Sequence, residues 1–475
     1  MLMCEQQNII IPDQETLQID QAVATLRKAI YNCTESIARP EPGLYTFSQP
    51  LMAADPLRWL ARQNLFPRIF WMNRERNFTI AGIGCADRIE LDEPGPNRES
   101  FERLVSTLAA KDPSTRSARY LGGFRFNNQE KQDGTWEGFP SFCFVLPLVQ
   151  LTLEENVFQL TCHLRIENGE DLADKRAQLL DTLDHLDTAE NSEDDQLPEM
   201  MQITCIPDRE LWTDCCRQAL ELFESGAMEK IMLARRTFLE FSTGFSPILY
   251  LLHYPYPKNS TYRFYFEPEK NRAFISFTPE RLYRRNGPVI LTEALAGTCM
   301  KERIKGSDDL ASEMLLNSEK DIREHGFVKD TIYRELQPVS SSVEMEEKLR
   351  VLQLNRLAHL YTRCTATLKP EYCSDSTVLS LLHPTPAVGG VPRDEALQHI
   401  MHLEPFCRGW YAAPVGWISR DSAEFCVGIR SALVNSRNTN LYSGAGLVKG
   451  SDPDLEWEEV EQKIGDIMAI TSHTA

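Results

Sequence analysis

The second half of this chain mixes strand-like and helical stretches without the regular strand–helix alternation of a parallel, doubly wound sheet. The strand-like runs are KIMLARRTFLEF at 230–241, TYRFYFE at 261–267, RAFISF at 272–277 and three short strands within 415–447. Helical spacing of apolar residues covers about 208–225, 307–335 and 452–470. Such a mixture favours an α+β fold over a parallel α/β fold.

The first half of the chain gives weaker signals. Apolar residues have helical spacing at 18–38 and 172–186, and residues 155–166 alternate as a strand does. Between the halves, residues 187–200 (DTAENSEDDQLPEM) are acidic and poor in apolar side chains, as expected of an exposed connector. We place a boundary there, although the same composition suits a long surface loop within one domain.

The composition excludes several classes of protein. With 475 residues, 42% hydrophobic and 25% charged, the chain can bury a large core. Its formal net charge of -19 argues against a general nucleic-acid binder, which gains affinity from Lys and Arg. No run reaches the roughly 20 apolar residues that span a bilayer, and the first residues lack the pattern of a signal peptide. The 13 cysteines include no CxxC pair, so we expect reduced thiols and a cytoplasmic protein.

Carboxylates gather on two of the expected helices. In the last helix Glu456 and Glu459 are three residues apart and Lys463 follows four residues later, so all three share one face. Glu324 lies in the middle of a helical stretch at 317–330. These residues could form ordinary solvated ion pairs, or they could supply oxygen ligands for a hard cation such as Mg²⁺.

Further features suit a site for an anionic substrate. Lys230 opens a strand and could accept a proton in a closed site, or face solvent. Glu280, in FTPERLYRR, could be a protonated acid facing a leaving group, or the partner of a nearby Arg. Two glycine-containing turns, ALAGT at 294–298 and SGAGL at 443–447, could present backbone N–H groups to an anion. Arg430, in VGIRS, could bind a carboxylate through its planar guanidinium group.

Taken in order, the segments of residues 205–470 resemble the chorismate-utilising enzyme family, which includes anthranilate, aminodeoxychorismate, salicylate and isochorismate synthases. The segments are KIMLAR, PERL, TEALAGT, SEKDIREH, HPTPA, GWYAAPVGW, VGIRS, SGAGLVKGSDPDLEWEE and QK. The resemblance implies an α+β fold of two antiparallel sheets packed face to face, with helices outside. It also implies that residues 205–475 form the chorismate-binding catalytic region, and that residues 1–200 form a variable N-terminal part of the same fold.

The resemblance further implies a cofactor and a set of site residues. Glu324, Glu456 and Glu459 match the carboxylates that bind Mg²⁺ in the family. Lys230 and Glu280 match a catalytic base and a catalytic acid. The positions that match substrate-binding groups are Gly297, Thr298, His383, Arg430, Gly444, Ala445, Gly446 and Lys463.

The residue at position 230 distinguishes the branches of the family. Aminating relatives typically carry a glutamine there, whereas Lys230 resembles the water-activating lysine of isochorismate and salicylate synthases. The implied reaction converts chorismate to isochorismate: neutral Lys230 takes a proton from the water that attacks C2, and Glu280 protonates the departing C4 hydroxyl. Salicylate synthases tend to carry a threonine in the stretch corresponding to Ala387–Val388, which is apolar here, so isochorismate is the expected product.

Other functions stay open at this point. A salicylate synthase would go on to eliminate pyruvate, a subunit of an amidotransferase complex would form anthranilate with ammonia, and a non-catalytic member would bind a metabolite as a sensor. We expect a monomer with no glutaminase subunit and no nucleic-acid or membrane partner. Menaquinone and siderophore pathways use the same chemistry, so the motifs do not distinguish them.

Overall fold

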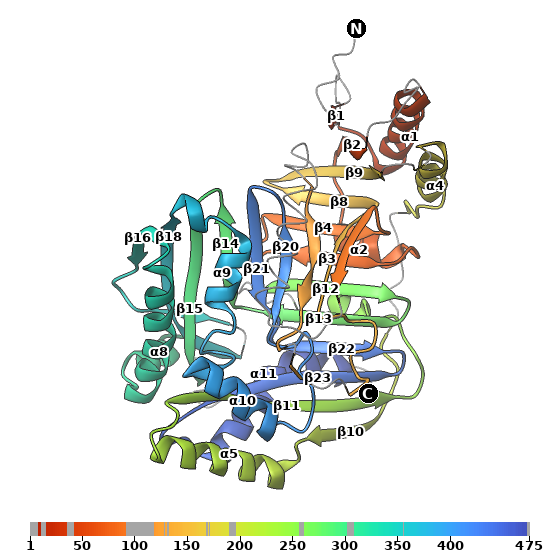
Figure 1. Ribbon diagram of the computed structural model, residues 1–475. Helices are drawn as coiled ribbons and strands as arrows, with labels where there is room; N and C mark the ends of the chain where they lie inside the picture. The colour runs from red at the N-terminus through yellow and green to blue at the C-terminus, as the bar shows by residue number, and fades with distance from the viewer. Residues whose placement is uncertain are drawn as a thin grey trace.

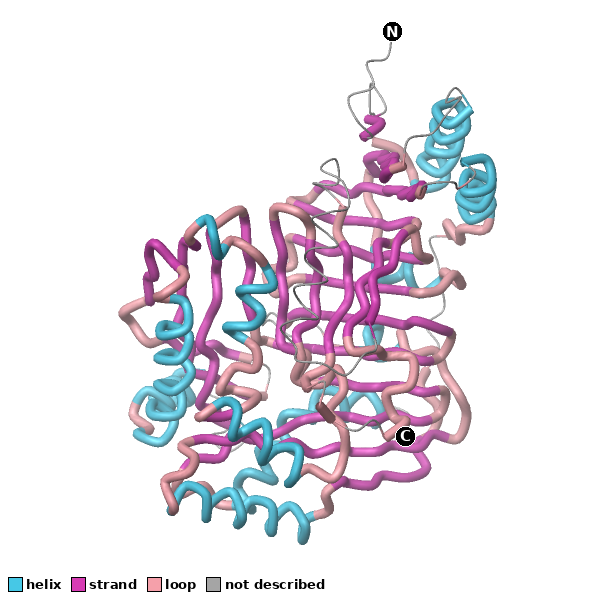
Figure 2. The backbone as a smooth tube through the Cα atoms, viewed as in Figure 1, coloured by secondary structure: helices cyan, strands magenta, loops and turns pink. Residues whose placement is uncertain are grey.

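The two sheets and outer helices that the resemblance implied are confirmed by the structure. The computed structural model describes residues 8–10, 16–35, 42–91, 118–127, 129–130, 133–167, 170, 172–189, 196–255, 261–301, 308–354 and 356–472. In this part of the chain two β-sheets pack against each other, and helices lie around the outside of the molecule (Figures 1 and 2).

The larger sheet contains thirteen strands among the described residues, and its neighbouring strands are antiparallel except for the pair β1 and β2. In spatial order they are β1 (Asn8–Ile10), β2 (Gly43–Leu51), β9 (Val157–Ile166), β8 (Val149–Glu154), β4 (Phe78–Ile83), β3 (Arg68–Met72), β12 (Tyr262–Glu269), β13 (Arg272–Thr278), β22 (Ser431–Asn435), β23 (Asn438–Val448), β11 (Lys230–Phe241) and β10 (Met200–Ile206), with β19 (Gly390–Val391) paired to β11. Lys230 is therefore the first residue of a strand near one end of this sheet.

The smaller sheet contains ten antiparallel strands in the described ranges. In spatial order they are β16 (Ser340–Met345), β18 (Leu357–Leu368), β15 (Val289–Met300), β14 (Arg281–Asn286), β21 (Ser422–Val427), β20 (Pro414–Ile418), β6 (Tyr120–Phe124), β7 (Phe142–Leu146) and β5 (Asp87–Leu91), with β17 (Arg350–Gln353) paired to β18. The chain crosses from the larger to the smaller sheet between β13 and β14, at Pro279–Glu280.

The helices pack on the outer faces and at the ends of the sheets. They are α1 (Ile19–Glu35), α2 (Pro56–Arg62), α4 (Leu172–Asp184), α5 (Arg209–Glu224), α6 (Leu249–His253), α7 (Asp308–Leu316), α8 (Glu319–Leu336), α9 (Asp375–Leu382), α10 (Arg393–Leu403) and α11 (Pro453–Ser472), with a 3₁₀ turn at Pro370–Tyr372. Two of them matter most for the site, because α8 packs on β15 and α11 packs on β23.

Both sheets contain strands from both halves of the chain. In the larger sheet β3 pairs with β12, and in the smaller sheet β6 pairs with β20. The acidic segment at 187–200, of which 190–195 lie outside the described residues, connects α4 to β10. It therefore joins two elements of one fold and does not separate two independently folded domains.

Aromatic side chains fill the space between the two sheets. Phe78 of β4 meets Trp417 of β20 with ring centroids 5.5 Å apart. The hydroxyl of Tyr262 on β12 donates a hydrogen bond to Glu424 of β21 at 2.7 Å. A second apolar cluster lies under α1, α2, α4 and α6, on the other face of the larger sheet. The larger sheet is thus covered on both faces, which suits its largely apolar strands.

Several local expectations are confirmed, and three are wrong. The strand expected at 230–241 and the closing helix are present, and Asp452 caps that helix by accepting from the N–H groups of residues 454 and 455. The helix expected at 307–335 is interrupted, because the Ser318 side chain accepts from the N–H of Asp321 and starts α8 anew. Residues 415–447 contain four strands instead of three, and SGAGL at 443–447 lies inside β23 instead of forming a turn.

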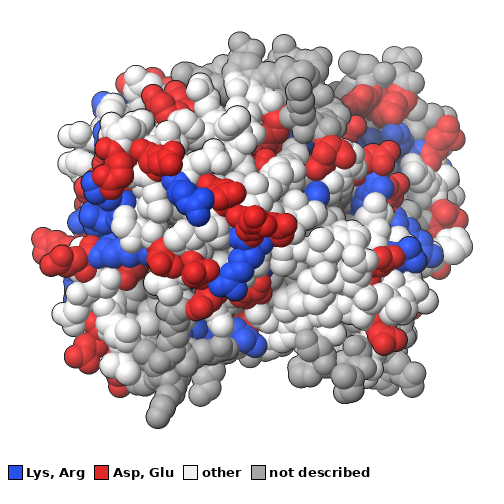
Figure 3. All heavy atoms as spheres, turned by 90° about the horizontal axis from the view of Figure 1, so that it is seen from below, with Lys and Arg blue, Asp and Glu red and all other residues white. Residues whose placement is uncertain are grey.

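The described surface mixes charges of both signs. On the face shown in Figure 3, Lys and Arg side chains lie among Asp and Glu side chains. Exposed ion pairs such as Arg209–Asp454 and Lys449–Glu224 are of this kind. No helix of the described residues is both long enough and apolar enough to cross a membrane.

Candidate active site

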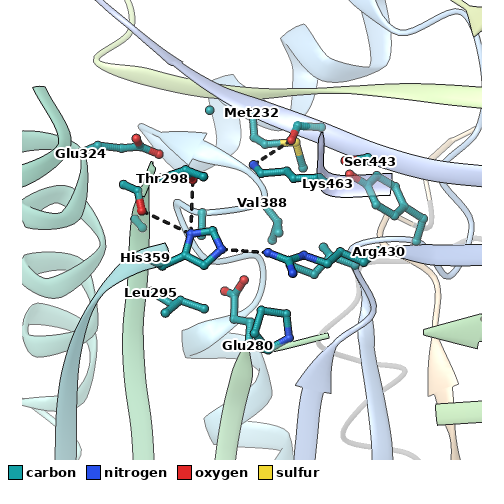
Figure 4. Close-up of a pocket in the computed structure, with 18 residues that line it drawn as sticks. Met232, Glu280, Leu295, Thr298, Glu324, His359, Val388, Arg430, Ser443 and Lys463 are labelled. Carbon is teal, nitrogen blue, oxygen red and sulfur yellow. Dashed lines mark hydrogen bonds between the residues drawn. The ribbon is translucent and has the colours of Figure 1, made fainter. Parts of the chain in front are cut away.

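A cavity is lined by residues of both sheets and of the helices α8 and α11 (Figure 4). Its empty space, including the open mouth, is about 590 Å³. The predicted site residues that line it are Glu280, Gly297, Thr298, Glu324, Arg430, Gly444, Gly446 and Lys463. Residues far apart in the sequence thus meet at one hollow, as the ordered motifs had suggested.

Lys230 lies directly behind the wall of this cavity. Its side chain is fully buried, and its Nζ donates a hydrogen bond to Oε1 of Glu324 at 2.9 Å. Gly446 lies next to both groups: a Cβ built on it would come within 2.7 Å of Glu324 Oε1 and 3.4 Å of Lys230 Nζ. A glycine at this position therefore keeps the space in front of both charged groups open.

Glu280 lies where the chain crosses from one sheet to the other. The carboxylate is buried, and its Oε1 accepts a long hydrogen bond of 3.4 Å from Oγ1 of Thr385. Burial, and then the nearby Glu293, raise the pKa of Glu280 to about 7, although Lys230 opposes them. The raised pKa favours the protonated form of Glu280, which a proton donor requires.

Glu324 is the second carboxylate of the cavity; it is partly buried, and its pKa is shifted in the opposite direction. Burial alone would raise its pKa, but Lys230, followed by Lys463 and Lys320, lowers the pKa of Glu324 below its usual value. Glu324 is therefore ionised at neutral pH. In the view of Figure 4 it lies with Lys463 on one side of His359 and Arg430, and Glu280 lies on the other side.

Each of the three predicted metal-binding carboxylates holds a lysine ammonium group. The pairs are Glu324 with Lys230 at 2.9 Å, Glu456 with Lys320 at 2.9 Å and Glu459 with Lys463 at 2.7 Å. Burial and the neighbouring Glu459 raise the pKa of Glu456 to about 7, against the opposing effect of Lys320. In this corner of the site each acid thus has one lysine partner, and Glu456 is the most deeply buried of the three acids.

The donor set suits Mg²⁺ in its chemistry, because all three side chains are carboxylates. Burial would lower the pKa of Lys320, but Glu456, followed by Glu459 and Glu324, raises it, so one ammonium group already lies in the field of all three acids. Within the part of the chain that the structure describes, no three Asp, Glu, His or Cys side chains converge on one point. A bound ion would therefore draw the carboxylates together and take the place of their lysine partners.

Arg430 and His359 form the floor of the cavity between the two acids. Arg430 has a left-handed backbone (φ 49°), which turns the chain sharply just before β22. Its Nη2 donates to Nε2 of His359 at 2.8 Å, while among the described residues its Nε has no hydrogen-bond partner. Burial, followed by the charges of Arg430 and Lys463, lowers the pKa of His359 well below its usual value, so the ring is neutral. The unpartnered Nε of a buried Arg430 is suited to an incoming anion.

The two glycine-containing segments shape the walls in different ways. Gly297 has φ 78° at an irregularity in the pairing of β15 with β18, and a Cβ there would lie 3.0 Å from that of Asp321. Gly444 lies opposite Ala234 within the β23–β11 pair, and its carbonyl oxygen accepts from Nζ of Lys463 at 3.0 Å. The first segment is therefore a bulge, whereas the second is a regular strand whose small residues keep the wall thin.

Two of the predicted substrate-binding residues do not line the cavity. His383 is buried, with its Nε2 3.3 Å from the carbonyl oxygen of Phe126, and its ring packs on the Phe126 ring. Ala445 is also buried within β23. Neither residue is among those that face the hollow, so their implied contact with substrate gains no support from this geometry.

Sequence reasoning missed four residues of the site. Tyr411 and His359 line the cavity, Thr385 contacts Glu280, and Lys320 contacts Glu456. Lys320 could have been found, because it precedes Glu324 by four residues and shares its helix face. The other three lie in segments whose local pattern gives no sign of chemistry.

Comparison with known proteins gives one family and consistent relatives. A family model described as chorismate binding enzyme matches residues 28–472. Isochorismate synthase MenF of Escherichia coli (strain K12) is 30% identical over 439 residues, covering 90% of this chain and 94% of the relative. The chloroplastic isochorismate synthase of Catharanthus roseus is 29% identical over 498 residues, covering 94% and 84% respectively. The solved structure of the menaquinone-specific isochorismate synthase MenF from Escherichia coli matches with a TM-score of 0.82 at 27% identity, covering 95% of this chain and 100% of that chain.

Proposed function

The chain belongs to the chorismate binding enzyme family, and on this premise we propose that it converts chorismate to isochorismate. The single observation that carries the proposal is that a buried lysine and a buried glutamic acid lie at different sides of one cavity. Lys230 lies behind the cavity wall, next to Gly446, and Glu280 lines the cavity on the side of His359 and Arg430 opposite to Glu324. A base and an acid on different sides of a flat ring suit the exchange of one hydroxyl group for another.

In the proposed reaction Lys230 first gives up the ammonium proton to solvent, and its neutral amine then takes a proton from a water molecule as the oxygen of that water bonds to C2 of chorismate. The ring double bonds shift, and the C4–O bond breaks. Glu280 gives its proton to the departing hydroxyl, which leaves as water. Positioned acids and bases of this kind each contribute about 10²–10⁴-fold in rate.

Cationic side chains suit the two carboxylates of chorismate. Arg430 offers its unpartnered Nε at the floor of the cavity, and Lys463 lines the side where Glu324 lies. Glu324, Glu456 and Glu459 would hold Mg²⁺, which would supply positive charge to polarise the ring carboxylate. Without that charge the three acids would repel a doubly anionic substrate, so the proposal includes dependence on Mg²⁺.

The apolar stretch at Ala387–Val388 supports isochorismate as the final product. Both residues line the cavity, and neither offers a hydroxyl group to a substrate. A salicylate synthase, an amidotransferase subunit and a non-catalytic binding protein are therefore treated as outcomes of the test.

Product identification with chorismate tests the proposal. The purified chain is incubated with chorismate in the presence of Mg²⁺ or a chelator, and the products are separated by chromatography. Isochorismate that forms only with Mg²⁺ is expected. Fluorescent salicylate plus pyruvate would replace the proposal with the salicylate synthase, and anthranilate formed with ammonia would indicate the amidotransferase branch. Tight Mg²⁺-dependent binding without any product would indicate a non-catalytic member. The variant Lys230→Ala is the matched control, since it should form no product.

A further inference from the structure

A hairpin from the first half of the chain reaches the crossing point that carries Glu280. In the larger sheet Met72, the last residue of β3, pairs with Arg263 of β12, and Arg263 pairs with Phe277 of β13. Strands β3 and β13 therefore lie on either side of β12 and run in the same direction, so they end at the same edge of the sheet (Figure 1). The turn that follows β3 is thus placed beside Pro279 and Glu280.

Asn73 shapes this turn. Its Oδ1 accepts from the N–H of Phe78 at 3.1 Å, and its Nδ2 donates to Oδ1 of Asn77 at 2.6 Å. Asn73 thus closes the β3–β4 turn and holds the intervening residues in place. Arg74, the next residue, is buried although it lies in a turn.

Arg74 and its partner hold the backbone on both sides of Glu280. Nη1 of Arg74 donates to the carbonyl oxygen of Pro279 at 2.8 Å and to Oε1 of Glu293 at 2.6 Å, while Nη2 donates to Oε2 of Glu293 at 2.8 Å. The same Oε1 of Glu293 accepts from the N–H of Arg281 at 3.1 Å. One bidentate ion pair therefore fixes the residue before Glu280 and the residue after it.

We propose that Arg74 is a positioning residue for the acid of the reaction: through Glu293 and Pro279 it fixes the place of Glu280 and the charge that Glu280 faces. The inference rests on the proposed function, because it assigns a role in that reaction. Arg74 does not line the cavity and acts through the groups it holds. It also gives the N-terminal half of the chain a direct part in the chemistry.

The charge around Glu280 is mixed, so the contribution of one pair can be isolated. The groups that act on it or feel its charge are Glu293 of β15, Lys230 of β11, Lys463 of α11, Arg430 before β22, Thr385, Tyr411 and Cys426 of β21. After burial, Glu293 is the largest influence that raises the pKa of Glu280. Arg74 at 2.6 Å and Arg281 at 3.7 Å both pair with Glu293, so removal of the nearer Arg74 would let more of the negative charge of Glu293 act on Glu280.

The test follows the protonation of Glu280 in Arg74→Met, Glu293→Gln and the double variant. An enzyme with an essential base and an essential acid has a bell-shaped pH profile of kcat/KM, with one break for each group. Because Glu280 must be protonated to act as the acid, one of these breaks reports its pKa. Arg74→Met should move that break upward by about one pH unit, and Glu293→Gln should move it downward. In the double variant the opposite shifts should largely cancel, while the second break stays in place in all three proteins.

Two further variants separate charge from loss of structure. Arg74→Lys keeps the charge but cannot form the planar fork, so kcat should fall while the break stays near its original pH. Arg285→Met is the matched control, because Arg285 of β14 forms a similarly buried pair with Asp375 of α9, at 2.5 Å. It should lower the melting temperature and leave both breaks unmoved. If Arg74→Met does not fold, the shift in Glu293→Gln decides the question.

A readout without turnover keeps this inference separate from the proposed function. The infrared band of the protonated Glu280 carboxyl, identified by its loss in Glu280→Gln, can be titrated in the absence of chorismate. A band whose midpoint moves with Arg74→Met and Glu293→Gln supports the inference even where no isochorismate is formed. The inference would be overturned if Arg74→Met and Glu293→Gln only lost stability and left the band and both breaks unmoved. That is the behaviour expected of the control Arg285→Met.

Discussion

Glu280 is a buried carboxylate and Glu324 a partly buried carboxylate of one cavity, yet their surroundings drive them to opposite charge states. Glu324 accepts a hydrogen bond from the Lys230 ammonium at 2.9 Å, and its pKa lies below the usual value. Glu280 accepts a longer bond from the Thr385 hydroxyl and faces Glu293, and its pKa is raised to about 7. Burial raises the pKa of both carboxylates, so the difference between them comes from their nearest partners. The lysine keeps Glu324 charged, whereas Glu280, without such a partner, can hold a proton and donate it.

Removal of Lys230 should produce the largest change. In Lys230→Met the partly buried Glu324 loses the fully buried lysine that it pairs with, which costs up to about 3–5 kcal/mol of stability, and turnover should fall about 10²–10⁴-fold. Because the pKa of Glu324 is lowered in the folded protein, this stabilisation is present above the unfolded pKa and is lost as pH falls through the folded value. Denaturant unfolding without Mg²⁺, at pH 8 and in acid, measures it. Equal stability of variant and parent at pH 8 would contradict the Lys230–Glu324 pairing.

Glu280→Gln should affect stability in the opposite direction. The pKa of Glu280 is raised from 4.5 to about 7, so its favourable contribution is complete below pH 4.5 and is lost as pH rises to about 7. At 1.36 kcal/mol per unit, the loss at pH 8 is about 3 kcal/mol. The variant should therefore unfold at higher denaturant than the parent at pH 8, match it near pH 4, and lose turnover about 10²–10⁴-fold. Near-normal turnover would remove Glu280 from the role of acid.

A third carboxylate, Glu456, extends the comparison to the residues that are proposed to bind Mg²⁺. The side chain of Lys320 is about two-fifths exposed, and its ammonium group forms an ion pair with Glu456, which the resemblance assigns to Mg²⁺. In Lys320→Met the ammonium no longer competes, so Mg²⁺ should bind several-fold more tightly in a calorimetric titration, a change of about 1 kcal/mol. Lys449→Met removes an exposed lysine paired with Glu224 and is the control. Unchanged or weaker Mg²⁺ binding in Lys320→Met would place the metal elsewhere.

The smallest effect is expected at Thr385. Its hydroxyl lowers the pKa of Glu280 through a long hydrogen bond, so Thr385→Val should raise the Glu280 break in the pH profile by a few tenths of a pH unit. The profile of kcat/KM measures it. A downward shift would show that the hydroxyl favours the protonated acid instead.

The sequence predicted the parts of the site whose signals are local. The strand that begins at Lys230 and the helix that carries Glu456 and Glu459 were found from periodicity and capping residues. The resemblance then joined segments that no periodicity could connect. The contacts that the sequence did not predict join residues far apart in the chain. Arg74 and Glu293, for example, are separated by 219 positions, and no local pattern indicates that they form a pair. The glycines of SGAGL at 443–447 predict a turn, whereas pairing with β11 holds this segment in a strand.

The interleaving of both chain halves in each sheet has a consequence for biosynthesis. During translation β3 emerges about 190 residues before β12, the strand it will pair with, which corresponds to roughly 10–40 s of elongation at about 5–20 residues per second. Until then the nascent polypeptide exposes unpaired strand edges and part of its aromatic interior. Until β12 emerges, the exposed edges and aromatic side chains make the nascent chain prone to aggregation.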